Sequence, residues 1–316
     1  MAAVETSGRS IGSVAILGAG AMGSLFAARI AEAGARVVVI DIDSQRLGAI
    51  AAEGIALTDD FGTRTVRVEA VHADEISSPV DLVVLFTKGM HSASAVASVA
   101  HLRASRPIAL TLQNGIGNAE LLAEGFGAER VVMGTAVIPA DLTGPCAVSS
   151  HGFASICLGS MAPDDDAKAQ RVATLLRAAR FTVTERIDIA AAVWEKLAFN
   201  AALNAIAMIC EVPNGGIDNA PGHRIAEAVA QETAAVAAAQ GIALDPGAIM
   251  VSIESALRSH RDHKASMLQD REQGRRTEIE MINGAIAREG ARLGVPTPVC
   301  DTLSDLVRII EAKMPR

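Results

Sequence analysis

The sequence predicts an α/β domain with a doubly wound sheet over residues 1–187, followed by an all-helical domain over residues 188–316. In the first part, short continuous apolar runs alternate with helical segments, as in parallel sheets covered on both faces. After Ile187, long helical segments dominate and are separated by Gly and Pro. The length of 316 residues suits two domains, and the 50% of hydrophobic residues can fill a large core.

The elements are expected in the following order. A buried strand at 13–17, a glycine-rich turn with a helix over 25–33, and a second strand at 36–40 form a βαβ unit. Later buried strands are expected at 81–86, 107–112, 131–135, 147–159 (antiparallel) and 181–186. Helices of the second part are expected at 188–210, 221–240, 245–259, 274–293 and 298–313.

The turn Gly18-Ala19-Gly20-Ala21-Met22-Gly23 predicts a dinucleotide site. It follows a buried strand and opens a helix, and Asp41 ends the next strand 18 residues beyond Gly23. Gly18 permits the tight turn, and Gly20 lets the backbone approach a pyrophosphate. Gly23 lets the helix pack closely on the strand, and the helix N-terminus attracts the phosphates. We therefore expect a Rossmann domain in which all six turn residues and Asp41 bind the cofactor.

The charges after the second strand bear on the choice of cofactor. The carboxylate of Asp41 can accept hydrogen bonds from the ribose hydroxyls and repels a 2′-phosphate, and Asp43 adds to this repulsion. Arg46 is the counter-argument, since it could turn towards a phosphate. On charge alone, the sequence favours NADH over NADPH.

A polar stripe interrupts the apolar helix expected over 188–210. Lys196, Asn200 and Asn204 are spaced four residues apart and so share one helix face. A solvated face would explain the stripe, but its flanking residues are Ala, Leu and Phe. The pattern favours a cleft-lining face.

A second polar cluster runs from Ser266 to Asn283. Thr277 could cap a helix there, with Glu280 at the spacing of a capping box. Capping does not explain the string Ser266-Met-Leu-Gln-Asp270, which indicates a functional segment.

With these motifs the chain resembles the ketopantoate reductase (2-dehydropantoate 2-reductase) family over almost its whole length. The resemblance rests on the glycine turn, Thr87-Lys88, Gln113-Asn-Gly-Ile-Gly-Asn118, Lys196-x3-Asn200-x3-Asn204, Ser266-Met-x-Gln-Asp270, Thr277-Glu278-Ile and Gly294-Val-Pro-Thr-Pro298. It implies an oxidoreductase of pantothenate biosynthesis that reduces a branched 2-keto acid to the 2-hydroxy acid. NADPH is the cofactor that the family implies, whereas Asp41 stands where typical members carry a basic residue.

The resemblance also implies roles for individual residues. Lys196 is the expected general acid, and Glu278 is its acidic partner. The expected substrate-binding residues are Asn114, Asn200, Asn204 and Ser266. Lys88 and Asn114 are expected beside the nicotinamide. The chemistry agrees, because an ammonium can stabilise and protonate the alkoxide that hydride attack on a ketone leaves.

Charge and composition argue against other classes. The net charge of −8 without a basic stripe argues against nucleic-acid binding. No stretch reaches 18 apolar residues without a charge, so no segment is expected to span a membrane. The first ten residues, interpreted as a short disordered tail, lack the basic-then-apolar plan of a signal peptide. Four widely spaced cysteines are expected to be free thiols in the cytoplasm. His260 and His263 lack a third ligand, so no metal is expected.

Other hypotheses stay open at this point. One is an NADH-dependent 2-hydroxy-acid dehydrogenase of the same family with another substrate. A related β-hydroxy-acid dehydrogenase shares the glycine turn but lacks the Gln113-Asn114-Gly115 and Ser266–Asp270 strings. A non-enzymatic dinucleotide sensor should have lost Lys196 and Glu278, which are both present. The sequence does not distinguish a homodimer from a monomer.

Overall fold

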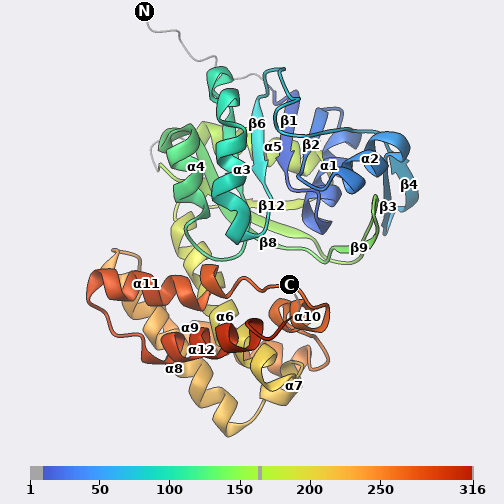
Figure 1. The fold of residues 1–316 in the computed structure, drawn as a ribbon. Coiled ribbons are helices and arrows are strands. Elements are labelled where there is room, and N and C mark those ends of the chain that lie inside the picture. Colours follow the sequence, from blue (N-terminus) through green and yellow to red (C-terminus); the bar gives the residue numbers. More distant parts are fainter. Residues whose placement is uncertain (1–9, 163–165, 315–316) are drawn as a thin grey trace, which may run out of the picture. The chain divides into compact units, whose positions relative to one another are not determined.

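The computed structural model describes residues 10–162 and 166–314, which form two compact units (Figure 1). One unit holds the chain up to Ile189 except for the segment Asn114–Gly117, and the other holds this segment and the chain from Ala190 onward. The sequence predicts Asn114–Gly117 to be part of the α/β domain, whereas the contacts of this segment place it in the helical unit. Nearly all of the expected N-terminal tail lies outside the described residues.

The α/β unit is built on an eight-stranded sheet with the order β12-β11-β8-β7-β6-β1-β2-β5. Neighbouring strands from β5 to β8 are parallel, and β11 pairs antiparallel with β8. This is the doubly wound order of a Rossmann fold, so the predicted fold class is confirmed. The strands are β1 (Ser13–Leu17), β2 (Arg36–Ile40), β5 (Glu69–Val71), β6 (Leu82–Leu85), β7 (Ile108–Thr111), β8 (Val131–Val137), β11 (Ser155–Ser160) and β12 (Thr182–Glu185).

Helices cover both faces of this sheet, which explains its continuous apolar strands. In β1, Val14 and Ile16 join one core and Ala15 and Leu17 join the other, because successive side chains of a strand point to opposite faces. The first core is completed by α1 (Ala21–Glu32), α2 (Ser44–Glu53) and α5 (Asp166–Ala178). The second core is completed by α3 (Ser92–Ser98), α4 (Asn118–Phe126) and the 3-10 turn Ala100–Ser105. Two further 3-10 turns lie at Gly89–His91 and Ala128–Arg130.

A second sheet in the same unit was not expected from the sequence. It has the order β4-β3-β10-β9, with β3 (Ile55–Asp59), β4 (Gly62–Val66), β9 (Asp141–Gly144) and β10 (Ala147–Ser150). The single strand predicted at 147–159 is therefore wrong: it is two strands, β10 in the small sheet and β11 in the large one. The chain turns between them at Gly152, which has φ +83° and donates its N–H to Asp60.

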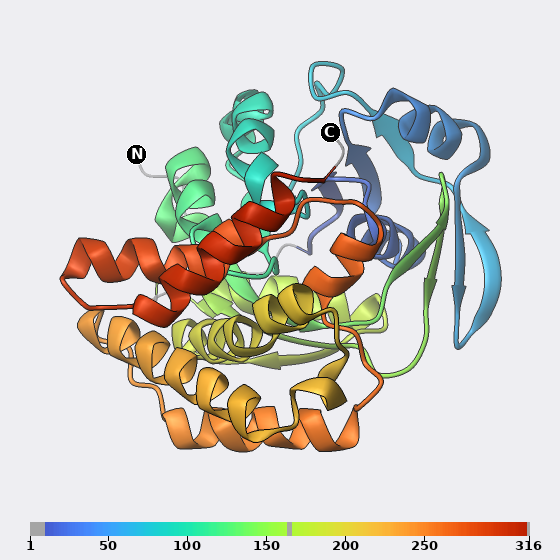
Figure 2. The same cartoon turned by 60° about the horizontal axis from the view of Figure 1, so that its bottom comes forward.

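The helical unit contains seven α-helices among its described residues. They are α6 (Ile189–Cys210, whose first residue belongs to the α/β unit), α7 (Asn214–Ile217), α8 (Ala220–Ala239), α9 (Pro246–Ser259), α10 (Ser266–Glu272), α11 (Asn283–Leu293) and α12 (Pro298–Glu311). α8 packs along α9, and α11 along α12 (Figure 2). Their apolar faces form one core around α6.

The helix predicted over 274–293 is wrong in its first part. Only a 3-10 turn, η4 (Ile279–Met281), precedes α11, and α10 lies further upstream. Thr277 does not start a capping box, because its backbone N–H and its hydroxyl both donate to Glu311. Glu280 instead forms ion pairs with Arg288 and Arg308.

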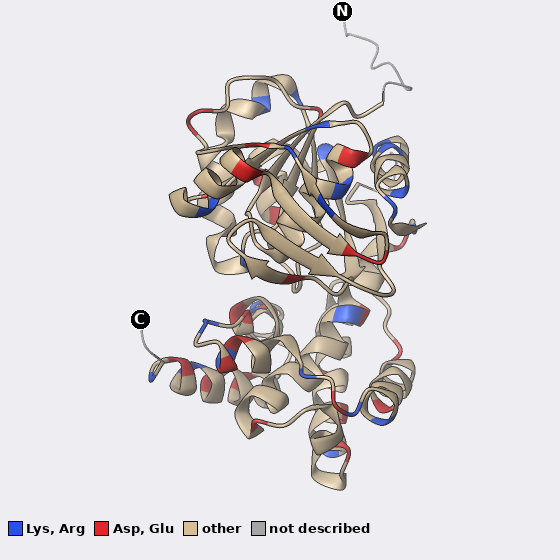
Figure 3. Cartoon of the chain, turned by 90° about the vertical axis from the view of Figure 1, so that its right-hand side faces the viewer, with Lys and Arg blue, Asp and Glu red and all other residues tan. Residues whose placement is uncertain are grey.

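α6 is long and apolar enough, by length and composition alone, to cross a membrane. However, 61% of an apolar 18-residue stretch of this helix is buried inside the structure, as in the core helix of a water-soluble protein. Acidic and basic residues are interspersed over both units (Figure 3).

Candidate active site

The glycine turn after β1 has the geometry that its sequence predicts. Gly18 has φ +105°, and a Cβ there would lie 2.8 Å from the backbone at Phe86 and Thr87. A Cβ at Gly23 would lie 1.8 Å from the carbonyl oxygen of Gly18, so only glycine lets α1 approach the turn this closely. A Cβ at Gly20 would meet nothing within 4 Å. Gly18 and Gly23 thus serve the fold, whereas Gly20 keeps space open beside the turn.

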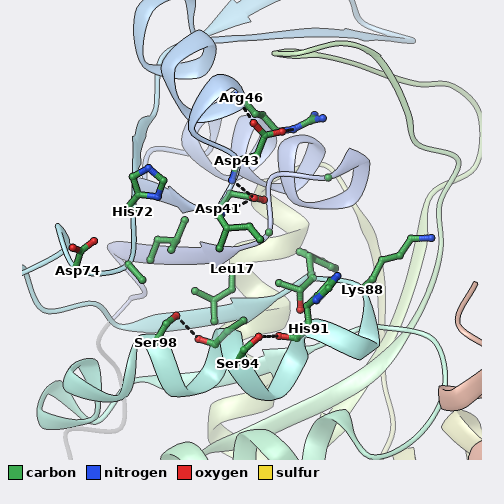
Figure 4. Close-up of a pocket in the computed structure, with 18 residues that line it drawn as sticks. Leu17, Asp41, Asp43, Arg46, His72, Asp74, Lys88, His91, Ser94 and Ser98 are labelled. Atoms are coloured by element: carbon green, nitrogen blue, oxygen red, sulfur yellow. Dashed lines mark hydrogen bonds and ion pairs between the residues drawn. The ribbon is translucent and has the colours of Figure 1, made fainter. Parts of the chain in front are cut away.

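A cavity of about 660 Å³ lies beside this turn, at the carboxyl ends of β1, β2 and β6 (Figure 4). Ligands of open α/β sheets bind at this edge. Four of the predicted cofactor residues line the cavity: Gly18, Gly20, Asp41 and Lys88. Ala19, Ala21, Met22 and Gly23 belong to the same turn and helix start but are not among its lining residues.

The carboxylate of Asp41 ties the glycine turn to the end of β2. One oxygen accepts from the N–H of Ala19 at 2.6 Å, and the other accepts from the N–H groups of Ile42 and Asp43 at 2.7 and 3.0 Å. A carboxylate has about four acceptor sites, so these bonds leave capacity for a further donor. Asp41 therefore has a structural role in addition to the predicted one.

Arg46 is engaged by its own neighbourhood. Its guanidinium lies 3.6 Å from a carboxylate oxygen of Asp43 and 3.4 Å from the carbonyl oxygens of Ala19 and Pro145. Asp43 also caps α2 by accepting from the N–H of Arg46. The basic charge nearest the end of β2 is thus partly balanced by a carboxylate.

Several residues that line the cavity were not singled out from the sequence as cofactor residues. His72 and Asp74 follow β5, and His91, Ser94 and Ser98 lie on or near α3, on the other side of the cavity from Asp43 and Arg46 (Figure 4). His91 is exposed and also lines the cavity. His72 and Asp74 come directly after the end of β5, and this position is the signal that could have found them; the residues on or near α3 carry no such signal.

The helical unit brings most of the predicted substrate residues together. The amide of Asn200 on α6 donates to the side-chain oxygen of Asn114 at 3.5 Å, and the amide of Asn114 donates to Glu278 at 3.4 Å. The amide of Asn204 donates to the hydroxyl of Ser266 at 3.3 Å. α6, α10, the segment before η4 and the loop 114–117 thus supply one polar cluster.

Lys196 has an environment suited to proton transfer. Burial lowers the pKa of Lys196 to about 8, and the nearby negative charge of Glu278 opposes this shift. An amine with a pKa near the working pH can give up and regain a proton readily. Strongly shifted groups of this kind are typical of active sites.

Gln113 belongs to the α/β unit although Asn114 does not. Its amide donates to the carbonyl oxygen of Thr87 and to Ser92, and Ser92 donates to Asn118. These bonds tie the ends of β6 and β7 together at the point where the chain leaves the sheet.

No cluster of three or more metal-ligating side chains occurs within residues 10–162 and 166–314. The four cysteines, all in these ranges, are free thiols.

Two models of one protein family match the chain. The model described as "Ketopantoate reductase PanE/ApbA" matches residues 14–163, and its C-terminal counterpart matches residues 188–311. A 2-dehydropantoate 2-reductase of Halobacterium salinarum is 31% identical over 300 residues, which cover 94% of this chain and 98% of the relative. The enzyme of that name from Archaeoglobus fulgidus is 32% identical, with 95% and 98% covered.

Solved structures agree with this family. A D-mandelate dehydrogenase in a ternary complex with NADH and anilino(oxo)acetate has a TM-score of 0.89 at 29% identity, covering 95% of this chain and 98% of that one. A PanE/ApbA family ketopantoate reductase from Ralstonia eutropha JMP134 has a TM-score of 0.86 at 30% identity, covering 95% and 99%.

Proposed function

The chain belongs to the ketopantoate reductase family, and from this membership and its polar cluster we propose that it reduces a branched 2-keto acid, 2-dehydropantoate or a close analogue, to the 2-hydroxy acid. The observation that carries this proposal is the hydrogen-bonded set Asn200–Asn114–Glu278, because the charge of Glu278 acts on Lys196, one helical turn before Asn200 on α6. Asparagine and serine side chains that suit a keto acid lie in the same cluster.

The cavity beside the glycine turn fits a nicotinamide dinucleotide. Its volume of about 660 Å³ lies in the range of small-molecule sites. Gly20 leaves open space there, and α1 directs its N-terminal N–H groups to the same turn, which suits a pyrophosphate. When bound, the reduced nicotinamide supplies a hydride for the carbonyl carbon. Gly18, Gly20, Asp41 and Lys88 would hold the cofactor.

Lys196 supplies the proton of the reaction. Its ammonium donates a hydrogen bond to the keto oxygen, stabilises the negative charge that develops there, and transfers a proton from Nζ to form the hydroxyl. A positioned acid of this kind contributes about 10²–10⁴-fold to the rate. Glu278 keeps the amine oriented and favours its protonated form.

The amides and the serine hydroxyl hold the substrate. Asn114 and Asn200 can exchange their mutual bond for bonds to the substrate's oxygens, because each amide has both donor and acceptor groups. Ser266 is exposed and Asn204 buried behind it, so Asn204 orients a hydroxyl that can donate to a carboxylate. Neither the Asn114–Asn200 pair nor the Asn204–Ser266 pair needs a charged side chain to bind the substrate.

We further propose NADH as the preferred reductant. The carboxylate of Asp41 retains capacity for a ribose hydroxyl and repels a 2′-phosphate. Asp43 forms an ion pair with Arg46, the cation on α2 that could otherwise bind that phosphate. The D-mandelate dehydrogenase of similar structure was solved with NADH, which supports the same choice.

A panel of branched, linear and aromatic 2-keto acids, each tested with NADH and NADPH, tests these proposals. Oxidation of NADH with 2-dehydropantoate at the highest kcat/KM is the expected result. The absence of turnover with every acid would refute the enzymatic proposal.

A second candidate is an NADH-dependent dehydrogenase for another 2-hydroxy acid. Asp41 and the similarity to a D-mandelate dehydrogenase favour it. A kcat/KM for an aromatic 2-keto acid above that for 2-dehydropantoate would establish this candidate.

The free thiols support the cytoplasm as the site of action. Analytical sedimentation would decide between a homodimer and a monomer.

A further inference from the structure

The backbone around Glu278 is fixed on both sides by distant parts of the helical unit. Before it, Thr277 is 2% exposed, and its N–H and hydroxyl donate to one oxygen of Glu311 at 2.7 and 2.6 Å. After it, the carbonyl oxygen of Met281 accepts from the N–H of Ile116 at 3.2 Å. The carboxylate of Glu278 therefore stands on a short segment that is held at both ends.

Gly115 makes the second attachment sterically feasible. It has φ +87°, and a Cβ there would lie 2.1 Å from the carbonyl oxygen and 2.7 Å from the carbonyl carbon of Met281. Both atoms belong to the backbone, so no rotamer change could relieve the overlap. A side chain at this position would push the loop 114–117 away from η4.

Gly117 in the same loop provides a natural comparison. It has φ +98°, but a Cβ there would meet nothing within 4 Å. Alanine at Gly115 or Gly117 would suffer the same disfavoured backbone conformation, because both glycines have positive φ. Only the substitution at Gly115 would also displace Met281.

This attachment bears directly on the polar cluster. Asn114 precedes Gly115 in the chain, and its amide donates to the carboxylate of Glu278. The distance between these side chains therefore depends on how closely the loop packs on η4. The charge of Glu278 in turn acts on Lys196.

We infer that Gly115 and Thr277 are positioning residues, which hold the Glu278 carboxylate against Asn114 without themselves contacting substrate or cofactor. This inference rests on the proposed function, in which Glu278 orients the proton donor. Displacements of about 1 Å in a catalytic site can lower the rate by about 100-fold, so a small backbone shift is sufficient for a measurable effect.

Gly115→Ala tests the inference, with Gly117→Ala as the matched control. We expect Gly115→Ala to lower kcat about 10- to 100-fold while changing the Kd of NADH much less, because the residues that line the cofactor cavity belong to the α/β unit. Gly117→Ala should keep kcat near the wild-type value. Equal losses in the two variants would show that backbone strain alone is responsible and would overturn the inference.

A double-mutant cycle separates positioning from a general effect on folding. If Gly115 acts through the Asn114–Glu278 pair, Gly115→Ala should cost little in an Asn114→Ala background. Fully additive losses would contradict the inference.

Thr277→Val provides the second variant if Gly115→Ala does not fold. It keeps the side-chain shape but removes the hydroxyl that donates to Glu311. We expect a lower kcat and an alkaline limb of kcat/KM at lower pH, because a displaced Glu278 supports the charge of Lys196 less. An unchanged kcat and pH profile would argue against the role of Thr277.

The same inference has a readout that does not depend on turnover. The rate at which an amine-reactive reagent labels Lys196, followed by mass spectrometry across pH, reports the protonation of this side chain. The midpoint should shift to lower pH in Gly115→Ala and not in Gly117→Ala. Identical midpoints would overturn the inference, whereas a lack of keto-acid turnover in the wild type would overturn only the proposed function.

Discussion

Replacement of Lys196 by methionine removes the ammonium but keeps a long unbranched side chain on α6. Burial lowers the pKa of this lysine to about 8, against the opposing charge of Glu278. At pH 7 about nine-tenths of the amine is therefore protonated, and the protonated fraction falls through one half near pH 8. Since a positioned acid contributes about 10²–10⁴-fold, Lys196→Met should lose at least about 100-fold in kcat at neutral pH.

The assay follows the absorbance of NADH with a 2-keto acid at pH values on both sides of 8. The wild-type kcat/KM should fall as the pH rises through about 8, because the ammonium is the reactive form and is lost in that direction. Glu278→Gln removes the charge that raises the pKa, so its alkaline limb should lie at lower pH. Lys196→Met should bind NADH with the wild-type Kd and show no such limb. A wild-type profile that is flat through pH 8, or a variant with nearly normal kcat, would refute Lys196 as the acid.

Further predictions concern the cofactor site. Asp41→Asn keeps a hydrogen-bond acceptor but removes the charge, so the ratio of kcat/KM for NADH over that for NADPH should fall about tenfold, the effect of roughly 1.4 kcal/mol; an unchanged ratio would contradict the charge argument. Gly23→Ala should lower the free energy of unfolding in urea by about 3 kcal/mol, because the added Cβ would overlap the carbonyl oxygen of Gly18. An unfolding midpoint equal to that of the wild type would disprove this packing role. Gly20→Ala should unfold at nearly the wild-type Tm, because the added Cβ meets only open space beside the turn. It should bind NADH more weakly in calorimetry, because the Cβ would occupy the space proposed for the pyrophosphate. An unchanged affinity would count against this position of the pyrophosphate.

Local patterns predicted the elements that make mostly local or uniformly apolar contacts. The β1–α1–β2 unit follows from continuous apolar runs and a glycine turn, and it is present, although α1 begins at Ala21, four residues before the predicted start. The small sheet was missed because its strands are partly polar, whereas the predicted strands of equal length in the large sheet are continuously apolar. One of its stabilising contacts is the buried ion pair between Arg29 of α1 and Asp59 of β3, which lie 30 residues apart.

The candidate site likewise combines features that local sequence patterns predict with contacts that form only in the folded chain. The helical spacing of Lys196, Asn200 and Asn204 placed them on one face of α6, as a 3.6-residue repeat requires. Their pairing with Asn114 and Ser266 depends on contacts across 86 and 62 residues of chain. Local periodicity in the sequence does not predict contacts between residues so far apart in the chain.

By itself, the sequence determined the fold class, the glycine turn and the family, because these depend on residue types at fixed short spacings. The tertiary structure alone decided that residues 114–117 belong to the helical unit and that Thr277 bonds to Glu311 instead of forming a capping box with Glu280. The reason is physical: a hydroxyl or an N–H group takes the acceptor that the packed chain brings within reach. For Thr277 this acceptor comes from 34 residues further along the chain.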